Sequence, residues 1–332
     1  MALSTAQYQE IMKEYDEVRR RNYMTEQERK ELVYQKIPEI REIDRKIAHI
    51  SIAKAKEMVQ KKVPDARESL RESIYELSME KINLLAIHDF PADYLDPIYD
   101  CPKCRDTGYI GSEKCSCLNE KASSLLRKQS NMEGSIAREN FANFCTEYYS
   151  PVPSGKERVS PRENICSILS QSHRFIEDFD RNPGQNLLIY GNAGVGKTFL
   201  SNCIGGELLS KGKNVLYLTA YQFFDRLADY TFRRKEENAR TLPDFLHCDL
   251  LIIDDLGTEL NNSFINSQLF LCMNERILNK KSTIISTNLS LEQISHVYTE
   301  RVFSRIIQSY TLFHIYGEDI RIKKAVSSLD KN

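Results

Sequence analysis

The stretch with the clearest chemistry is GNAGVGKT, residues 191–198, which matches the phosphate-binding pattern G-x-x-x-x-G-K-[ST]. Its glycines let the backbone turn N–H groups toward a phosphate, since residues without Cβ adopt the required φ values without a steric penalty. Lys197 is expected to reach the β- and γ-phosphates, and Thr198 to offer its hydroxyl to Mg²⁺. We therefore predict an ATP site at this loop, formed by Gly191, Asn192, Ala193, Gly194, Val195, Gly196, Lys197, Thr198 and Phe199.

A second group of polar residues follows two later apolar runs. Asp254 and Asp255 end the run LLII at residues 250–253, and adjacent acids there are costly unless an ion or water compensates them. We expect Asp254 to hold Mg²⁺ through water and Asp255 to orient or deprotonate the attacking water. Asn288 ends the next run and is expected to position the same water. These residues predict an ATPase, not only a nucleotide-binding protein.

The cysteines form a third candidate site. Four of the nine cysteines fall within residues 101–117, in a chain with no export signal, which favours a metal site over disulfides. The pair Cys101 and Cys104 has the spacing of a zinc knuckle, whereas Cys115 and Cys117 are separated by one residue instead of the usual two. We predict a structural Cys₄ zinc site. A redox Cys-x-x-Cys motif is the alternative, and no thioredoxin-like strand and helix surround it.

Basic residues suggest two further functions. Arg301 and Arg305 lie four residues apart, on one face of a predicted helix, where an arginine could stabilise the γ-phosphate of a neighbouring subunit or form an ordinary surface salt bridge. Farther upstream, aromatic and basic residues alternate in a pattern that suits single-stranded DNA, because cations attract phosphates and rings stack on bases. The alternative is a solvated basic helix face. These candidate DNA-binding residues are Tyr230, Phe232, Arg233, Arg234 and Lys235.

The elements around the phosphate loop predict an α/β fold with a parallel sheet. Near-continuous apolar runs separated by helical patterns are typical of a sheet covered on both faces, with its nucleotide site at the carboxyl ends of the strands. We expect strands at residues 187–190, 215–219, 250–253, 283–286 and 311–315, and helices at residues 165–179, from residue 199 to about 210, and from residue 221.

The composition and the remaining pattern predict the domain organisation. The chain has 332 residues, 28% of them charged and 41% hydrophobic, with a net charge of −1, so any DNA-binding surface must come from local clustering of basic residues. No secretory signal and no apolar run of transmembrane length is present, and we expect a cytoplasmic protein. The predicted segments are a helical partner-binding region at 1–98, the zinc knuckle at 99–120, a linker at 121–160 and the ATPase domain at 161–332.

The helical region at 1–98 carries three apolar stripes with spacings of three and four residues. Pro38 is expected in the first turn of the second helix, and Val63-Pro64 precedes the third. Such helices could form a small antiparallel bundle or pack against a partner. Phe141 and Phe144 are expected to anchor the linker on the ATPase domain, with ordinary partly buried aromatic residues as the alternative.

The order of GNAGVGKT, LLIIDDLG, ISTN, ERVFSR and DIRIKKA resembles that of an AAA+ ATPase. In detail it resembles the DnaC/DnaI group of bacterial replicative helicase loaders and, nearly as well, the IstB-type transposition helper ATPases. The resemblance is strong over residues 140–325. Over residues 1–120 it rests on architecture alone, because a helical region with a zinc knuckle is similar to the helicase-binding part of the DnaI arrangement.

The resemblance implies specific roles. Asn288 corresponds to the sensor 1 residue, Arg305 to the arginine finger and Arg321 to the sensor 2 arginine that touches the γ-phosphate. Most AAA+ proteins have Asp-Glu where this chain has Asp254-Asp255, so the general base is either Asp255 or Glu259. The chain ends soon after Arg321, and we expect no separate large helical lid.

The expected function is ATP-dependent loading of a hexameric replicative helicase, with ATP, Mg²⁺ and Zn²⁺ as cofactors, single-stranded DNA as a ligand, and self-association through the AAA+ domain. Hydrolysis is expected to be slow in an isolated chain. Two alternatives stay open: a transposition helper ATPase acting on double-stranded DNA, and a nucleotide-gated adaptor whose hydrolysis is incidental.

Overall fold

The computed structural model describes residues 3–60, 66–153, 157–233, 244–259 and 263–329. They form two compact units: an N-terminal unit of residues 8–118, and a C-terminal unit of residues 119–332 with residues 1–7. The two units are folded around separate hydrophobic clusters. Within the described part of the chain, no helix is both long and apolar enough to cross a membrane.

The C-terminal unit contains a parallel sheet whose described strands have the order β4-β5-β6-β3-β7. The predicted α/β fold with a parallel sheet is therefore confirmed, and each predicted strand lies within a few residues of an observed one. β6 lies between β3 and β5. Asn288, which follows β6, therefore lies between the phosphate loop after β3 and the acids Asp254 and Asp255 of β5. The strands are β3 Asn186–Tyr190, β4 Val215–Thr219, β5 Leu250–Leu256, β6 Ser282–Thr287 and β7 Tyr310–His314.

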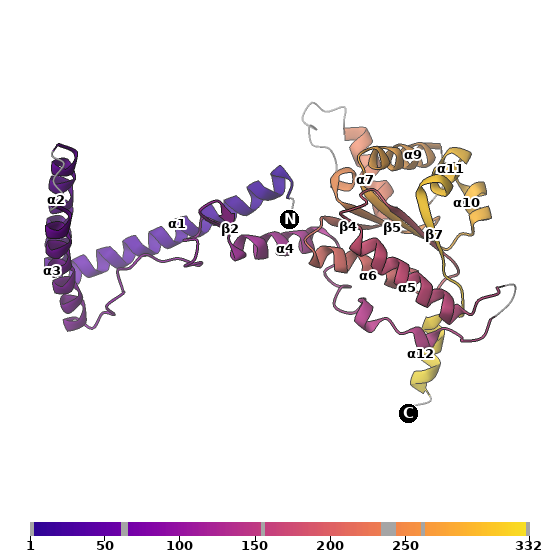
Figure 1. The fold of residues 1–332 in the computed structure, drawn as a ribbon, viewed down its shortest axis with the longest axis horizontal. Helices are drawn as coiled ribbons and strands as arrows, with labels where there is room; N and C mark the ends of the chain where they lie inside the picture. Colours follow the sequence, from indigo (N-terminus) through magenta and orange to yellow (C-terminus); the bar gives the residue numbers. More distant parts are fainter. Residues whose placement is uncertain (1–2, 61–65, 154–156, 234–243, 260–262, 330–332) are drawn as a thin grey trace. The chain divides into compact units, whose positions relative to one another are not determined.

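Helices cover both faces of this sheet (Figure 1). Alternate strand residues supply the two cores, so that Leu187 and Ile189 pack against α5 (Pro161–Glu177) and α6 (Lys197–Ser210). Leu188 faces the other core, which is formed mainly with α7 to α11. These helices are α7 Ala220–Arg233, α8 Asp244–His247, α9 Ser263–Leu278, α10 Leu291–Val297 and α11 Glu300–Ser309, and α12 Ile320–Leu329 follows β7.

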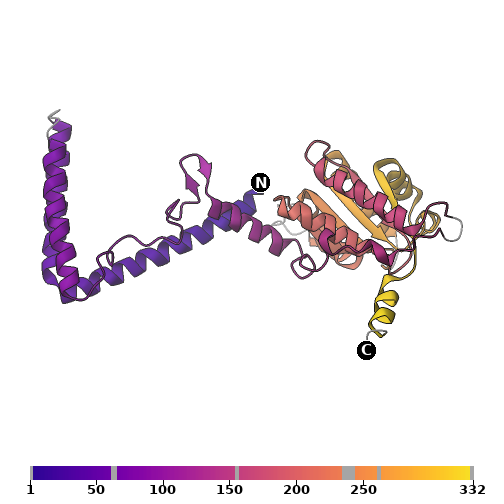
Figure 2. The ribbon, with the colours of Figure 1, turned by 60° about the horizontal axis from the view of Figure 1, so that its bottom comes forward.

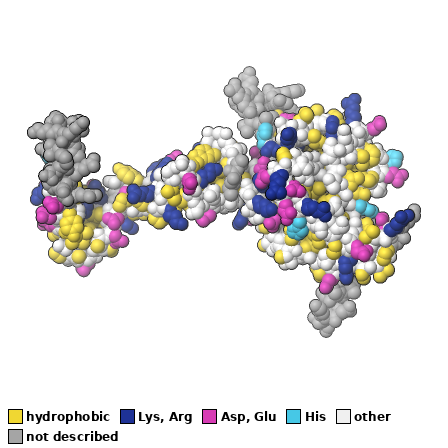
Figure 3. Space-filling model, viewed as in Figure 1, with side chains coloured by type: hydrophobic (Ala, Val, Ile, Leu, Met, Phe, Trp, Pro, Cys, Tyr) yellow, Lys and Arg dark blue, Asp and Glu magenta, His cyan; other side chains and the backbone are white. Residues whose placement is uncertain are grey.

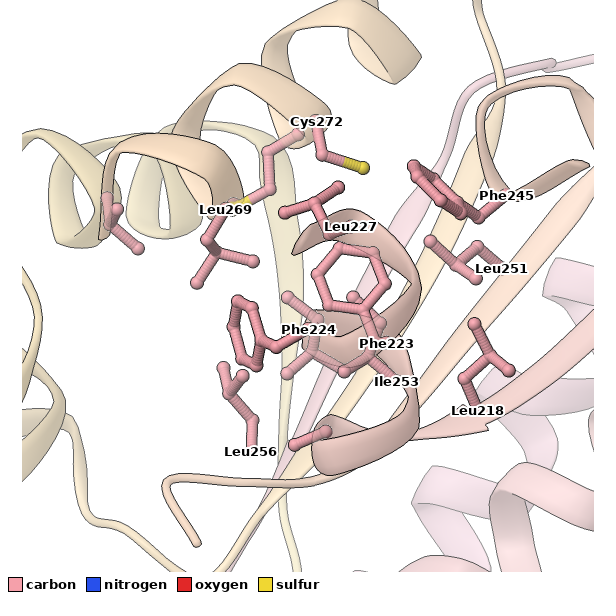
Figure 4. Packing of buried hydrophobic residues seen from close by; sticks show 14 of the residues in the cluster. Leu218, Phe223, Phe224, Leu227, Phe245, Leu251, Ile253, Leu256, Leu269 and Cys272 are labelled. Atoms are coloured by element: carbon pink, nitrogen blue, oxygen red, sulfur yellow. The ribbon is translucent and has the colours of Figure 1, made fainter. Parts of the chain in front are cut away.

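The core beneath α7 explains the aromatic residues at the start of that helix. Phe223 and Phe224 point into the cluster beside Leu227, Leu251 and Ile253 (Figure 4). Their rings stack edge to face with centroids 5.0 Å apart. Because both are buried, they serve the fold and cannot stack on a nucleic acid base.

The N-terminal unit is built on α1 (Thr5–Lys36), α2 (Pro38–Gln60) and α3 (Ala66–Ile87). The chain breaks between α1 and α2 because proline lacks an N–H donor, and Pro38 opens α2 as predicted. The C-terminal end of α1 packs with α2 and α3 through a hydrophobic cluster. Its buried residues are Val33, Ile37, Ile40 and Leu85.

The other end of α1 packs against the cysteine-containing loop. This loop includes the two short antiparallel strands β1 (Tyr109–Ile110) and β2 (Glu113–Lys114), and Figure 2 shows this hairpin beside α1. Ile11 and Tyr15 of α1 are buried. Tyr15, which belongs to the first apolar stripe of the sequence together with Tyr8, Ile11 and Val18, thus lies against the cysteine loop, with its hydroxyl 3.0 Å from Cys117 Sγ.

The region predicted as a linker, residues 121–160, is largely ordered on the C-terminal unit. It contains most of α4 (Ser116–Gln129) and two short 3-10 helices, η1 (Phe141–Asn143) and η2 (Thr146–Tyr148). Met132 and Tyr149 are buried in the C-terminal unit, and Phe141 and Phe144 pack against the same core. The prediction that these two phenylalanines anchor the segment is confirmed.

Candidate functional site

The phosphate loop joins β3 to α6, which begins at Lys197. Gly194 and Gly196 have φ values of +77° and +97°, in the left-handed region that favours glycine. Gly191 is required for a second reason, since a Cβ there would lie 1.8 Å from the carbonyl oxygen of Ile315. The loop therefore wraps tightly between β3 and the end of β7, and leads into the amino end of a helix, where anions are favoured.

Lys197 is buried at the centre of this loop, with an exposed fraction of 5%. Its Nζ donates to the carbonyl oxygens of Gly191 and Asn192 at 2.9 and 2.7 Å, and to Oδ1 of Asn288 at 2.6 Å. Burial lowers the pKa of this amine, and the nearby carboxylates of Asp255 and Asp254 oppose that effect. The lysine is thus held in a fixed position where a phosphate can replace its neutral partners.

Asp254 is the buried acid of the site. Thr198 Oγ1 donates to its Oδ2 at 2.9 Å, and the hydroxyls of Ser286 and Tyr217 also contact its carboxylate. Carboxylate and hydroxyl oxygens are the hard ligands that Mg²⁺ prefers, usually with several waters retained. The pair Thr198 and Asp254 therefore has the donor set that a magnesium ion requires.

Asp255 reaches the same site because the strand is irregular at this point. Successive residues of a regular strand point to opposite faces, but the pairing of β5 with β6 shifts between Ile253 and Leu256, and Asp255 has φ +56°. A bulge of this kind re-aims a side chain. The pKa of Asp255 is raised, mainly by burial and then by Asp254, and Asn288 Nδ2 lies 3.5 Å from its Oδ1.

A cavity of about 510 Å³ opens beside these groups. Nine of its lining residues belong to the sites predicted from the sequence: Ala193, Gly194, Gly196, Lys197, Thr198, Phe199, Asp255, Asn288 and Arg321. The structure thus brings together the phosphate loop, the second acid and the two polar residues from later in the chain.

The other lining residues come mainly from the segment before the sheet, and sequence reasoning missed them: Glu139, Asn143, Phe144, Cys145, Tyr148, Tyr149, Ile320 and Lys324. Phe144 and Tyr149 have nearly parallel rings with centroids 6.2 Å apart, and Phe199 meets Phe144 edge to face at 5.4 Å. Such rings can form an apolar wall for a purine base. The aromatic residues between 141 and 149 could have indicated this wall from the sequence, which predicted only an anchoring role for Phe141 and Phe144.

Arg321 lies at the start of α12, which is docked on the phosphate loop. The N–H of Ile320 donates to the carbonyl oxygen of Gly194 at 3.0 Å, and Asp319 Oδ1 accepts from the N–H of Arg321 at 2.8 Å. The Arg321 side chain is 73% exposed at the rim of the cavity. Its guanidinium pairs with the carboxylate of Asp319, with Nε 3.4 Å from Oδ1, and because this ion pair is exposed, a phosphate in the cavity could take the place of Asp319.

Arg305 and Glu259 lie outside the cavity lining. Arg305 is half-buried on α11, and Arg301 on the same helix is exposed. Glu259 accepts from the hydroxyl of Tyr298 and, at 2.9 Å, from the N–H of Gly257. Glu259 thus ties the loop after β5 to the residue that follows α10, and Asp255 is the acid that faces the cavity.

The four clustered cysteines converge in the N-terminal unit. The Sγ atoms of Cys101, Cys104, Cys115 and Cys117 all lie within 4.8 Å of one another. The backbone N–H of Cys117 lowers the pKa of the Cys115 thiol to about 7, which favours a thiolate. Burial raises the pKa of the Cys117 thiol to about 12, so that thiol would lose its proton only to a bound ion. The arrangement of the four sulfurs fits a closed tetrahedral zinc site, despite the unusual spacing of the second pair.

A buried polar network fixes this cluster to α1. Tyr15 Oη lies 3.0 Å from Cys117 Sγ. Asp106 accepts from the N–H groups of Asp100 and Cys101 at 3.0 and 2.7 Å, and from Asn22 Nδ2 at 3.2 Å. The cysteine loop and one face of α1 therefore share a set of hydrogen bonds.

The candidate DNA-binding residues lie at and beyond the end of α7. Tyr230 packs edge to face on Phe245 with centroids 6.5 Å apart. The side chains of Phe232 and Arg233, and all of Arg234 and Lys235, lie outside the described residues. On the face drawn in Figure 3, basic and acidic side chains are intermixed over the C-terminal unit.

Comparison with known proteins gives a consistent result for the C-terminal unit. The family described as "IstB-like ATP binding protein" matches residues 169–328. The replicative helicase loader DnaC of Escherichia coli (strain K12) is 29% identical over 158 residues, which span 47% of this chain and 64% of that protein. The chromosomal replication initiator protein DnaA of Wolinella succinogenes is 32% identical over 146 residues, or 42% of this chain and 32% of that protein.

A crystal structure of the DnaC helicase loader aligns with a TM-score of 0.44 at 23% identity, and covers 55% of this chain and 98% of that one.

Proposed function

We propose that this protein is an ATP-dependent loader of a replicative DNA helicase. The premise is that residues 169–328 form an IstB-like ATP-binding domain, of the kind found in replicative helicase loaders. The C-terminal unit binds ATP and single-stranded DNA, and the N-terminal unit binds a hexameric helicase. The observation that carries the ATP-dependent part is the meeting of Lys197, Asp255, Asn288 and Arg321 at one cavity.

The residues at the cavity have different roles in ATP hydrolysis. Lys197 and Arg321 counter the charge of the transferred phosphoryl group, and Thr198 and Asp254 hold Mg²⁺, which when bound neutralises charge on the phosphates. Asp255 orients the attacking water and accepts its proton. The raised pKa of Asp255, caused by burial and by Asp254, makes it a stronger base than an ordinary aspartate. Asn288 positions the same water.

Arg305 acts on the nucleotide of a neighbouring subunit. It is absent from the lining of its own chain's cavity, which is what an arginine supplied in trans requires. A planar, permanently charged guanidinium can stabilise the transition state there. Self-association through the C-terminal unit is therefore part of the proposal, and an isolated chain hydrolyses ATP slowly.

The N-terminal unit is the helicase-binding part, with a structural zinc ion held by the four cysteines. With four thiolates the ion has no open coordination position, so its role is to fold the loop and not to react. The names of the DnaC relatives support the helicase as partner.

Single-stranded DNA is the ligand proposed for the end of α7. Tyr230 is half-buried at that end, and the basic residues Arg233, Arg234 and Lys235 follow it in the sequence. Aromatic and cationic groups together bind single strands through stacking and phosphate contacts.

Two experiments test the proposal. Mixing the full chain with a replicative helicase hexamer from the same source should give a stable complex by size-exclusion chromatography, whereas an unchanged elution of both proteins would contradict the loader function. ATP hydrolysis should be stimulated by self-association or DNA, and Lys197→Ala should abolish it.

The alternatives predict different results. A transposition helper ATPase, which the family description keeps open, would form filaments on duplex DNA and would not need the cysteine site. A nucleotide-gated adaptor would lose function in Lys197→Ala but retain it in Asp255→Ala, because that variant can still hold ATP.

A further inference from the structure

Tyr217 occupies an unusual place beside the acid that holds the magnesium ion. It lies on β4, which β5 and β6 separate from β3 and the phosphate loop, and its hydroxyl donates to Oδ2 of Asp254. Burial and the carboxylate of Asp254 raise the pKa of the phenol. The phenol therefore stays neutral and acts as a hydrogen-bond donor throughout the physiological range.

Asp254 has few other means of holding its orientation. Its carboxylate is buried and also accepts from Thr198 and Ser286. Thr198 is itself a candidate Mg²⁺ ligand. When the ion is bound, the Thr198 hydroxyl would contact the ion and would no longer orient the Asp254 carboxylate. Ser286 and Tyr217 remain as the other donors to this carboxylate, and Ser286 Oγ also accepts from the N–H of Asp255 at 3.2 Å.

The backbone of Tyr217 is fixed in turn by a segment outside the sheet. β4 is an edge strand, and such a strand normally presents unpaired backbone groups. Here the N–H of Tyr217 donates to the carbonyl oxygen of Ser130 at 2.9 Å, and Asn131 Nδ2 donates to the carbonyl oxygen of Tyr217 at 3.1 Å. We call residues 130–132 the edge strap.

The edge strap is itself firmly held. Ser130 and Met132 are fully buried, and Ser130 Oγ donates to the carbonyl oxygen of Arg127 at 2.7 Å. Asn131 has φ +61°, a conformation that asparagine tolerates better than most residues. The strap thus fixes the edge strand at the residue whose side chain reaches Asp254.

We propose that Tyr217 is a positioning residue for Asp254, that it sets the affinity of the nucleotide site for Mg²⁺, and that the edge strap holds it in place. This inference rests on the proposed ATP-binding function. Partners that orient a metal-binding group typically change metal affinity 10- to 100-fold when they are removed. A tyrosine that merely fills space on β4 would instead affect nucleotide binding equally with and without the ion.

The test is the Mg²⁺ dependence of nucleotide binding by the full chain carrying Tyr217→Phe. Binding of a fluorescent ATP analogue is measured first in EDTA and then during a titration with MgCl₂. We expect unchanged affinity in EDTA and an Mg²⁺ midpoint raised by about tenfold or more. Asn131→Gly, which keeps the backbone conformation but removes one bond from the strap, should move the midpoint in the same direction by less.

Tyr310→Phe is the matched control, since it removes a buried tyrosine hydroxyl from β7 at the opposite edge of the sheet. Its Mg²⁺ midpoint should equal that of the wild type. An unchanged midpoint in Tyr217→Phe, or an equal loss of binding with and without Mg²⁺, would overturn the inference while leaving nucleotide binding established. Failure of the wild type to bind the analogue under either condition would overturn the proposed function together with this inference.

Discussion

The amino group of Lys197 lies 2.6 Å from Oδ1 of Asn288, which joins the phosphate loop after β3 to the end of the neighbouring strand β6. The other end of the same amide lies 3.5 Å from Asp255. Asn288 thus contacts both Lys197, the proposed phosphate-binding lysine, and Asp255, the proposed base. It can align the two because β6 lies between β3 and β5.

Asn288→Ala should therefore impair hydrolysis much more than nucleotide binding. Lys197 keeps its contacts to two loop carbonyls, so affinity should fall by no more than about tenfold, the value of one ordinary hydrogen bond. The turnover rate should fall about 100-fold, as when one preorganised polar group is removed from a reacting centre. Steady-state kinetics with a separate binding assay would check this, with exposed Asn182→Ala as the control. Equal losses in both assays would contradict it.

Asp255→Asn should stabilise the nucleotide-free protein while abolishing hydrolysis. The pKa of Asp255 is raised in the folded state, by burial first and by Asp254 second, so the folded state binds its proton more tightly than the unfolded state does. Ionisation of Asp255 therefore lowers the free energy of unfolding. This loss of stability is absent at pH values below the ordinary pKa of aspartate, grows as the pH rises toward the raised pKa, and is complete above it. Thermal unfolding of both proteins across this range should show a gain for the variant that disappears in acid. A gain independent of pH would be inconsistent with this origin.

The two candidates for the general base can be separated through the contacts of Glu259. Its two carboxylate oxygens accept from the Tyr298 hydroxyl and from the N–H of Gly257. A glutamine can keep both contacts, because its Oε1 accepts from the N–H of Gly257 while its Nε2 donates to the Tyr298 hydroxyl, which can also accept. Glu259→Gln should therefore retain most of the hydrolysis rate, in contrast to Asp255→Asn. Glu259→Ala should destabilise the fold by about 1–3 kcal/mol, because a buried hydroxyl loses its acceptor. Loss of hydrolysis in a stable Glu259→Gln protein would instead identify Glu259 as the base.

Mixing two inactive variants tests whether Arg305 acts in trans. Lys197→Ala removes the phosphate-binding group and Arg305→Ala removes the proposed finger, so each protein alone should hydrolyse ATP at less than about a thousandth of the normal rate. In a mixture, some neighbouring pairs combine an intact loop with an intact arginine, and partial activity should return. Arg301→Ala, an exposed arginine on the same helix, should be active alone. A mixture as inactive as its components would argue that Arg305 acts within its own chain or not at all.

Local sequence determined the strands well but not the shape of the site. Short apolar runs such as Leu250–Ile253 have few other ways to be buried, so the strands and the parallel sheet could be predicted. The bulge that turns Asp255 toward Asp254 could not, because it depends on the pairing of β5 with β6. The aromatic wall of Phe144 and Tyr149 was missed for a similar reason: proline and serine after it indicated a linker, whereas packing against distant residues decides its structure.

The cysteine spacing predicted a convergent cluster, but not what the cluster packs against. The stripe at Tyr8, Ile11 and Tyr15 was consistent with any apolar partner. In the structure, Gly108 approaches the Tyr15 ring so closely that an added Cβ would lie 3.1 Å from it. The helix α1 and the cysteine loop, which lie far apart in the sequence, thus share one core, which no local pattern can indicate.

Removing zinc should therefore loosen α1 as well as the cysteine loop. The strands β1 and β2 are two residues each, and the hydrogen bonds of Tyr15 and Asn22 depend on the positions of Cys117 and Asp106 in the loop. Loss of the proposed ion should release these positions and expose Ile11, Tyr15 and Asn22. Helices without tertiary contacts are only marginally stable in water. Chelation should accelerate amide hydrogen exchange in residues 5–26, with unchanged exchange in β3 and β6 of the other unit. Cys104→Ser should behave like the chelated protein, and Cys166→Ser, an exposed cysteine outside the cluster, should retain one zinc per chain. Identical exchange in α1 with and without the ion would show that the cluster does not support this helix.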